Sequence, residues 1–347
     1  MRKALLFIFL LSALSATGQE GQFSQYFASG ALMNPAFPGT ITTINFNTNY
    51  KRAGSPDQEN HVELMQGSFS YPLRRVTTKE EYFGSVGVTF FRENRGYQGV
   101  YRNQKILGNF SYVVNLSELR NQLLVFGIQG GYAQLNLSDD GYRWGSQFNK
   151  YLDGGYDGDL AGESVTFDPV WYPVINFGAL YTTYDNDDYK IRDYAFSVGI
   201  SGDNLNRPKI GTVEGFDAKK AMLYKAFAVF QFPIGARFYG HPSAYVLNSN
   251  GSTQFNLGMY ISTFVSSSRS NLGVELQTGA WYRVDDSFIG LIGLKIDQLK
   301  VGFSVDMNAT NQGLNEQVGG NVSAYEITLG YSFELHKSYR RLSNPMF

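Results

Sequence analysis

The fold is decided by the stretch from Leu272 to Phe333, which contains LGVELQTGAWY (272–282), VGFSVD (301–306) and EITLGYSF (326–333). In each run, apolar residues alternate with glycine, small polar residues or a carboxylate. A period of two indicates a β-strand whose two faces differ in chemistry. The non-apolar face suits a wet lumen better than a dry sandwich core. The stretch therefore predicts a transmembrane β-barrel.

The same alternation recurs along the chain and predicts an all-β fold, an antiparallel transmembrane barrel of about fourteen strands. Crossing a bilayer at a tilt takes about 9 to 11 residues, and most of the expected strands are that long or longer. A soluble β-sandwich is the competing interpretation, but its strands usually have about five or six residues. The expected strands are 43–52, 61–72, 82–92, 101–115, 122–135, 171–184, 191–201, 221–233, 243–248, 253–264, 270–282, 288–296, 299–308 and 323–334.

Composition agrees with an exported barrel. The chain of 347 residues has 24 Tyr, 27 Phe and 38 Gly, but no cysteine. Aromatic girdles at both membrane interfaces are typical of outer-membrane barrels. The formal net charge of −1 argues against nucleic-acid binding and against electrostatic docking to a membrane.

Residues 1–18 are expected to be a signal peptide. Arg2 and Lys3 give the positive start, Ala4 to Ala13 the apolar stretch, and cleavage is expected before Gln19. An aromatic and proline-containing lead follows, through which a regular helix or central strand is not expected. The expected division is 1–18 signal peptide, 19–42 lead segment, 43–335 barrel and 336–347 basic periplasmic tail.

The expected connections differ in length. If both ends of the mature chain are periplasmic, the loops after odd-numbered strands face outward, and they include the three longest: 136–170, 202–220 and 309–322. Three of the inward connections are short: 185–190, 265–269 and 297–298. Long outward loops and short periplasmic turns are normal in such barrels. The charged connection 72–81 is a longer inward exception.

The first long outward loop holds the candidate surface residues. Its carboxylates and glycines offer a weak calcium site, because calcium takes six to eight oxygen ligands, but solvated turns are the commoner use of such loops. Its aromatic residues either contact a partner protein or pack within the loop and the outer girdle. The calcium candidates are Asp153, Asp157 and Asp159, and the aromatic candidates are Trp144, Tyr151, Tyr156 and Phe167.

Polar residues on the inner face leave two interpretations open. Glu275, Gln277 and Asp306 either set ion selectivity in a channel or pair with other groups in a filled lumen. His61 and His241 lie far apart in the sequence, and no nucleophile-elbow motif occurs. We therefore expect no enzymatic activity and no cofactor.

The chain contains QFSQY (22–26), LMNPAFPG (32–39), TGAWYR (278–283) and AYEI (324–327), before a basic tail that ends NPMF (344–347). Together these motifs resemble the PorP/SprF family of the type IX secretion system of Bacteroidota. The resemblance spans nearly the whole mature chain, although 136–260 matches only in general character. Family members often end in Cys-Pro-aromatic, whereas Asn344 precedes Pro345 here, so any role of that cysteine is absent.

The resemblance implies an outer-membrane barrel that helps secrete and anchor a large cell-surface adhesin through its type-B C-terminal domain, in some cases for gliding motility. It also implies contacts with periplasmic secretion or motility components, besides outer-membrane lipid. The lead would fold into the lumen or meet such partners through Phe23, Tyr26, Asn34 and Pro35. A fourteen-stranded channel or transporter for a small solute is the alternative function.

Overall fold

A computed structural model describes most of the chain. The described residues are 21–54, 60–75, 81–97, 99–117, 122–138, 144–152, 155, 157–160, 162, 167–183, 194–212, 218–235, 237–265, 273–309 and 322–333. Among them, no helix is both long enough and apolar enough to cross a membrane.

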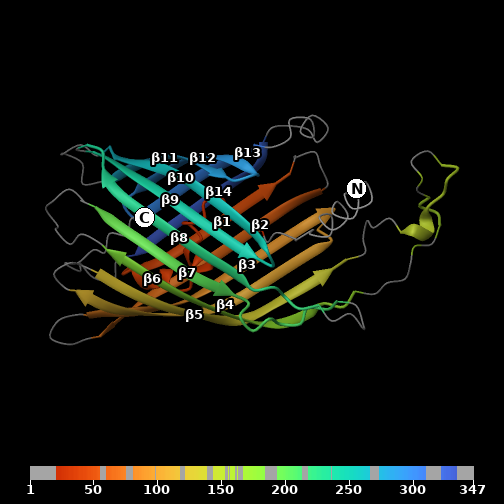
Figure 1. The fold of residues 1–347 in the computed structure, drawn as a ribbon, viewed down its shortest axis with the longest axis horizontal. Helices are drawn as coiled ribbons and strands as arrows, with labels where there is room; N and C mark the ends of the chain where they lie inside the picture. Colours follow the sequence, from red (N-terminus) through yellow and green to blue (C-terminus); the bar gives the residue numbers. More distant parts are fainter. Residues whose placement is uncertain are drawn as a thin grey trace, which may run out of the picture.

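The described residues form fourteen antiparallel strands that close into one barrel (Figure 1). Each strand pairs with its neighbour in sequence, and β1 pairs with β14 to close the sheet, from Ile44 opposite Phe333 to Ala53 opposite Ala324. The barrel strands are β1 Ile44–Ala53, β2 Asn60–Arg75, β3 Glu81–Tyr97, β4 Tyr101–Ser117, β5 Gln122–Leu137, β6 Val170–Thr183, β7 Ala195–Asp203, β8 Leu223–Pro233, β9 Phe238–Ser249, β10 Ser252–Phe264, β11 Val274–Arg283, β12 Ser287–Ile296, β13 Leu299–Asn308 and β14 Val322–Phe333.

The two faces of the strands have the predicted chemistry. On β13, Val301 and Phe303 are exposed on the outer wall, whereas Ser304 and Asp306 are buried on the inner wall. On β14, Ile327 is likewise exposed and its neighbour Glu326 is fully buried. The outer wall is thus apolar, as contact with lipid requires, and the inner wall carries the small and polar residues.

Some boundaries differ from the expectation. Strand β2 continues through Pro72 to Arg75 and pairs with β3, with a register shift after Leu73, so the expected long turn 72–81 is shorter. Strand β9 has 12 residues, twice the expected length, because Gly240 and Pro242 lie within it and conceal its alternation. Strands β7 and β11 each begin four residues later than expected.

The barrel has two rims. At the terminal rim β1 begins and β14 ends; at the loop rim β1 ends and β14 begins. The three longest loop-rim connections are 138–169, 204–222 and 309–321. The first contains the short 3-10 helix η2, Gly145–Gln147, which stands apart from the barrel at the right of Figure 1.

Candidate functional site

The barrel encloses residues 21–43, which we call the lumen segment. Its first described residue, Gly21, donates its N–H to the buried carboxylate of Glu93 at 3.1 Å, near the loop-rim end of β3. Its end lies at the terminal rim, where Arg74 donates to the carbonyl of Thr42 at 2.9 Å. The segment therefore runs through the lumen from one rim to the other.

Two short helices give the lumen segment its shape. Helix α2, Gly30–Met33, has only 4 residues and ends before Asn34-Pro35. The 3-10 helix η1, Phe37–Thr40, follows with Pro38 in its first turn. Proline restricts the residue before it and cannot continue a regular helix or a central strand, so the segment is compact but irregular.

A buried polar cluster holds the start of the lumen segment. Ser24 donates its backbone N–H to Glu326 at 2.6 Å and its hydroxyl to Asp306 at 2.7 Å. Asp306 also pairs with Lys51 at 2.9 Å and with Arg283 at 3.3 Å. Two cations thus face two carboxylates, which compensates the charges that burial removes from water. We call Lys51, Arg283, Asp306 and Glu326 the wall cluster.

The polar groups of the next residue, Gln25, all form hydrogen bonds. Its backbone N–H lies 3.3 Å from both oxygens of Glu326. Its side-chain amide donates to Ser304 at 3.2 Å and accepts from Thr328 at 3.0 Å. A Cβ at Gly302 would collide with this amide, so the glycine allows the close approach.

Aromatic residues hold the middle of the segment. Tyr26 stacks on Tyr245 with ring centroids 4.7 Å apart, and its hydroxyl donates to Ser243 at 2.7 Å. Phe27 packs against Trp281, with centroids 5.8 Å apart. Burial disfavours the phenolate and raises the pKa of Tyr26 to about 12.

The Asn34-Pro35 turn rests on glycines of the wall. Asn34 donates its amide to the carbonyls of β6 and β7, Ala179 at 3.2 Å and Ile200 at 3.0 Å. A Cβ at Gly178 would overlap the Asn34 amide, and one at Gly127 would overlap the Pro35–Ala36 peptide. These positions of the wall lack a side chain where the turn makes contact.

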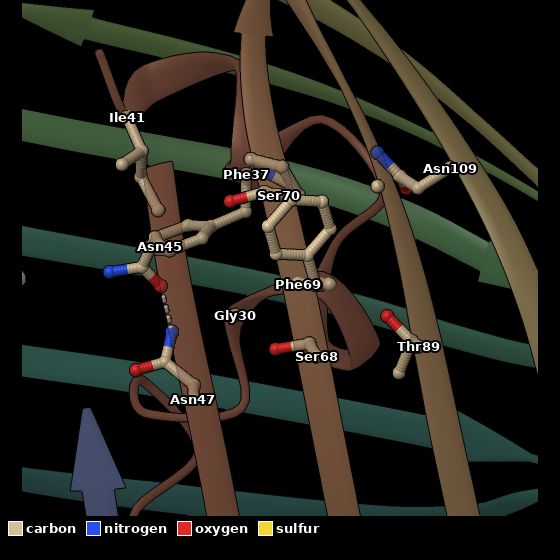
Figure 2. A pocket seen from close by; sticks show the side chains of 13 residues that line it. Gly30, Phe37, Ile41, Asn45, Asn47, Ser68, Phe69, Ser70, Thr89 and Asn109 are labelled. Atoms are coloured by element: carbon tan, nitrogen blue, oxygen red, sulfur yellow. Dashed lines mark hydrogen bonds between the residues drawn. The ribbon is translucent and has the colours of Figure 1, made fainter. Parts of the chain in front are cut away.

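A gap remains between residues 30–41 of the lumen segment and strands β1 to β4. Figure 2 shows Phe37 and Gly30 on one side of this gap and polar side chains of the wall on the other. It is a small, partly open hollow of about 10 Å³, roughly the space that one water molecule needs. The polar side chains on its wall are all neutral: Asn45, Asn47, Ser68, Ser70, Thr89 and Asn109.

The four lead residues predicted to bind partners are occupied inside the barrel. Phe23 meets Phe91 edge-on with centroids 6.3 Å apart, and Tyr26 and Asn34 make the contacts described above. Pro35 accepts a hydrogen bond from Ser111 at 3.0 Å. Partner binding by these four residues remains a prediction.

The loop residues are placed differently from one another. Tyr151 is 83% exposed, whereas Trp144 is half-buried and lies close to Gly162. Phe167 is also half-buried, and Tyr156 lies outside the described residues. Phe148, which the sequence reasoning did not select, is 69% exposed.

The calcium prediction cannot be assembled from the described residues. Asp153 lies outside them. Asp157 accepts hydrogen bonds from Asn149 at 3.0 Å and from the N–H of Asp159 at 3.1 Å. Within the described ranges, no three His, Cys, Asp or Glu residues are grouped to hold a metal ion. The calcium site remains a prediction.

The wall cluster joins motifs that are far apart in the sequence. Ser24 and Gln25 belong to QFSQY, Arg283 ends TGAWYR, and Glu326 lies in AYEI. Sequence reasoning selected Asp306 for the lumen but missed Lys51. The available signal was charge on the small-residue face of each strand, since a charge there needs a buried partner.

The family model "Type IX secretion system membrane protein PorP/SprF" matches residues 15–331. The chain belongs to this family. As a PorP/SprF protein it is an outer-membrane component of the type IX secretion system, and the family implies interactions with secretion components and cargo.

One solved structure supports the barrel fold of this PorP/SprF protein, and two others are more distantly similar. The toluene transporter TbuX of Ralstonia pickettii has a TM-score of 0.52 at 12% identity, over 89% of this chain and 94% of TbuX. A FadL homologue of Pseudomonas aeruginosa gives 0.42 at 11% identity, over 89% and 94% of the two chains. BamA of Haemophilus ducreyi without POTRA domains 1–3 gives 0.42 at 10% identity, over 84% and 70%. No curated protein sequence matches.

Proposed function

We propose that this PorP/SprF protein helps secrete a large surface adhesin and anchors it through the adhesin's type-B C-terminal domain, in a system that can serve gliding motility. The work is binding rather than chemistry, and it needs no cofactor. Periplasmic secretion or motility components meet the other side of the barrel. This proposal goes beyond the family's general role in secretion.

The observation that carries the proposal is the occupied lumen. Phe23, Ser24, Gln25 and Tyr26 are all at most 5% exposed, and the segment that contains them is bonded to the wall along its course. An open diffusion pore needs a free lumen, whereas an anchor needs a rigid barrel with a binding surface. The occupied lumen therefore favours an anchor that acts through its rims.

The loop rim is the proposed adhesin-binding side. The loop that contains η2 presents Phe148 and Tyr151, and exposed aromatic residues are enriched in protein interfaces. In this orientation the terminal rim and the tail 336–347, which lies outside the described residues, are periplasmic. Gly21, the first described residue, then lies at the outward rim, which differs from the periplasmic N-terminus expected from the sequence. Residues 1–18 are removed during export, and 19–42 act as a plug.

An affinity purification tests the anchoring function. The tagged full-length barrel is cross-linked in cells, extracted gently from outer membranes and analysed by mass spectrometry. We expect a large surface protein, cross-linked through its C-terminal domain. The double variant Phe148→Ser/Tyr151→Ser is expected to lose it. Tyr194→Ser is the control, because Tyr194 is 66% exposed and lies beside β7 at the opposite rim. This variant is expected to retain the surface protein.

Recovery of the barrel alone, from a strain that expresses the adhesin, would contradict anchoring. Equal recovery with both sets of variants would instead show that the adhesin binds elsewhere on the barrel. The two results are distinct, because the first concerns the function and the second concerns the loop.

The hollow beside β1 to β4 favours a second candidate, a channel for small solutes. Its uncharged polar lining, including Ser70 and Asn109, suits water and neutral polar molecules. Conductance in planar bilayers separates the two candidates. A steady open current from the wild-type protein would support the channel and count against a plugged anchor.

A further inference from the structure

Three arginines lie on strands β1, β3 and β4 of the outer wall near the loop rim. One row of directly paired residues crosses the first four strands: Arg52 on β1 pairs with Glu63 on β2, and Asn94 on β3 pairs with Arg102 on β4. Glu63 and Asn94 also pair with each other, which joins the row. Directly paired residues of antiparallel strands point to the same face. Arg92 lies two residues from Asn94 and therefore shares that face. We call Arg52, Arg92 and Arg102 the arginine belt.

The arginine belt begins where the apolar surface ends. On β3 the outward residues Val86 and Val88 are exposed, and Arg92 follows on the same face toward the loop rim. On β4 the exposed Phe110 and Ile106 precede Arg102 in the same way. A residue just beyond the lipid-facing surface meets the headgroup layer of the membrane.

The belt has little internal compensation. The Nε atoms of Arg52 and Arg102 are buried and have no hydrogen-bond partner among the described residues. Arg92 donates its Nε to Asn94 at 3.2 Å. No carboxylate of the described chain forms an ion pair with any of the three. Their guanidinium groups are therefore able to bind an external anion.

Glu63 is the one carboxylate among these side chains. It accepts hydrogen bonds from Tyr50 at 3.1 Å and from Asn94 at 3.5 Å, and the ring of His61 lies 3.6 Å away. Its oxygens are thus engaged by neighbours. Among the described residues of this surface, three positive charges face one negative charge, so this part of the surface is cationic.

The belt is confined to one side of the barrel. Strands β3 and β4 each have 17 residues, whereas β12 and β13 have 10, so the first pair extends well beyond the roughly 9 to 11 needed to cross a bilayer. On the shorter strands, outward residues near the loop rim include the exposed Phe288 and Met307. Arginines that merely marked the membrane–water boundary would not need to be concentrated on one side of the barrel.

We propose that the arginine belt binds the phosphate groups of an outer-leaflet glycolipid, with the acyl chains on the apolar wall below. A guanidinium matches phosphate geometry through paired N–H donors. In such a glycolipid the phosphates lie next to the acyl chains, just as the arginine belt lies next to the apolar wall. The positions of the two surfaces therefore match. The site rests on the proposed orientation, in which the loop rim faces outward, but it does not depend on the adhesin.

The test measures lipid binding by native mass spectrometry on the full-length barrel in detergent, with bisphosphorylated lipid A as the probe. The triple variant Arg52→Gln/Arg92→Gln/Arg102→Gln is expected to weaken binding on the order of a hundredfold. Lys150→Gln/Arg207→Gln/Lys219→Gln removes the same charge from exposed loop positions and is expected to bind like wild type. Retained heat-modifiable migration in gels verifies that each variant is folded.

Two further arms identify the ligand. Dephosphorylated lipid A is expected to bind wild type as weakly as lipid A binds the triple variant. Inorganic phosphate at millimolar concentration is expected not to displace lipid A. Equal binding by wild type and the triple variant would overturn the site, and so would an equal loss in the control. Displacement by free phosphate would overturn the lipid assignment. Because this assay contains no adhesin, its failure is distinct from failure of anchoring.

Discussion

At the scale of single residues, Asp306 joins the wall to the lumen segment. It is 1% exposed and faces both Lys51 and Arg283. Asp306→Asn would leave two buried cations with less compensation, and breaking such a pair typically costs about 3 to 5 kcal/mol. We expect the free energy of unfolding, measured by urea titration in lipid vesicles, to fall by about that amount.

Asp159→Asn is the matched control for this prediction. It makes the same chemical change on an exposed loop carboxylate, where we expect a change of about 0.5 kcal/mol or less. Similar unfolding free energies for both variants would mean that the wall cluster contributes little to stability.

Tyr26 gives the lumen segment a pH dependence. The pKa of its phenol is raised from 10.0 to about 12 by burial, so between these values the folded chain keeps a proton that the unfolded chain has lost. The contribution of Tyr26 to the free energy of unfolding is fully present below pH 10. It falls as pH rises toward 12, by about 1.4 kcal/mol per pH unit. Tyr26→Phe is expected to lose about 1.4 kcal/mol less stability than wild type between pH 8 and pH 11.

Tyr151→Phe controls for the loss of any tyrosine hydroxyl, because Tyr151 is 83% exposed. Its stability is expected to follow wild type across the same pH range. The interpretation of Tyr26 is wrong if Tyr26→Phe and wild type lose equal stability between pH 8 and pH 11.

The alternation of inward and outward residues along each strand determined which residues of the site could be predicted. Glu275, Gln277 and Asp306 were assigned to the inner face because strands alternate strictly, and all three are buried there. The partners of Asp306 were not predictable. The pairing of Lys51 with Asp306 depends on barrel closure and on the position of Ser24, and neither is encoded in local spacing.

At the scale of elements, the fit between the lumen segment and the glycines of the wall can be tested directly. Gly178→Val would place a side chain where Asn34 now lies, and should displace the turn without disturbing the outer wall. Valine is itself a good strand residue, so we expect the barrel to fold. The expected result is a higher steady conductance in planar bilayers than the wild-type protein gives.

Gly67→Val is the matched control, because a Cβ there meets no atom within 4 Å. It is expected to conduct like wild type. A Gly178→Val barrel that folds but stays as closed as wild type would show that the Asn34 turn does not limit passage through the lumen.

The elements also differ in how well the sequence predicted them. All fourteen strands were expected, because each has an outer lipid face and an inner small or polar face. The course of residues 21–43 was not, because α2 and η1 are too short to show a period. Proline positions indicated only that the segment is irregular, and its aromatic residues only that it is not a plain leader.

At the scale of the whole molecule, the orientation in the membrane governs both proposals, and the absence of cysteine makes it measurable. Tyr151→Cys places one thiol on the projecting loop, and Gln298→Cys places one in the exposed turn 297–298 at the terminal rim. Because the longest connections gather at the loop rim, as they do on the outer side of such barrels, we expect a membrane-impermeant maleimide to label Tyr151→Cys in intact cells. Gln298→Cys is expected to react only after the outer membrane is permeabilised. The reverse labelling pattern would place the aromatic loop and the arginine belt on the periplasmic side, where neither an extracellular adhesin nor an outer-leaflet lipid could reach them.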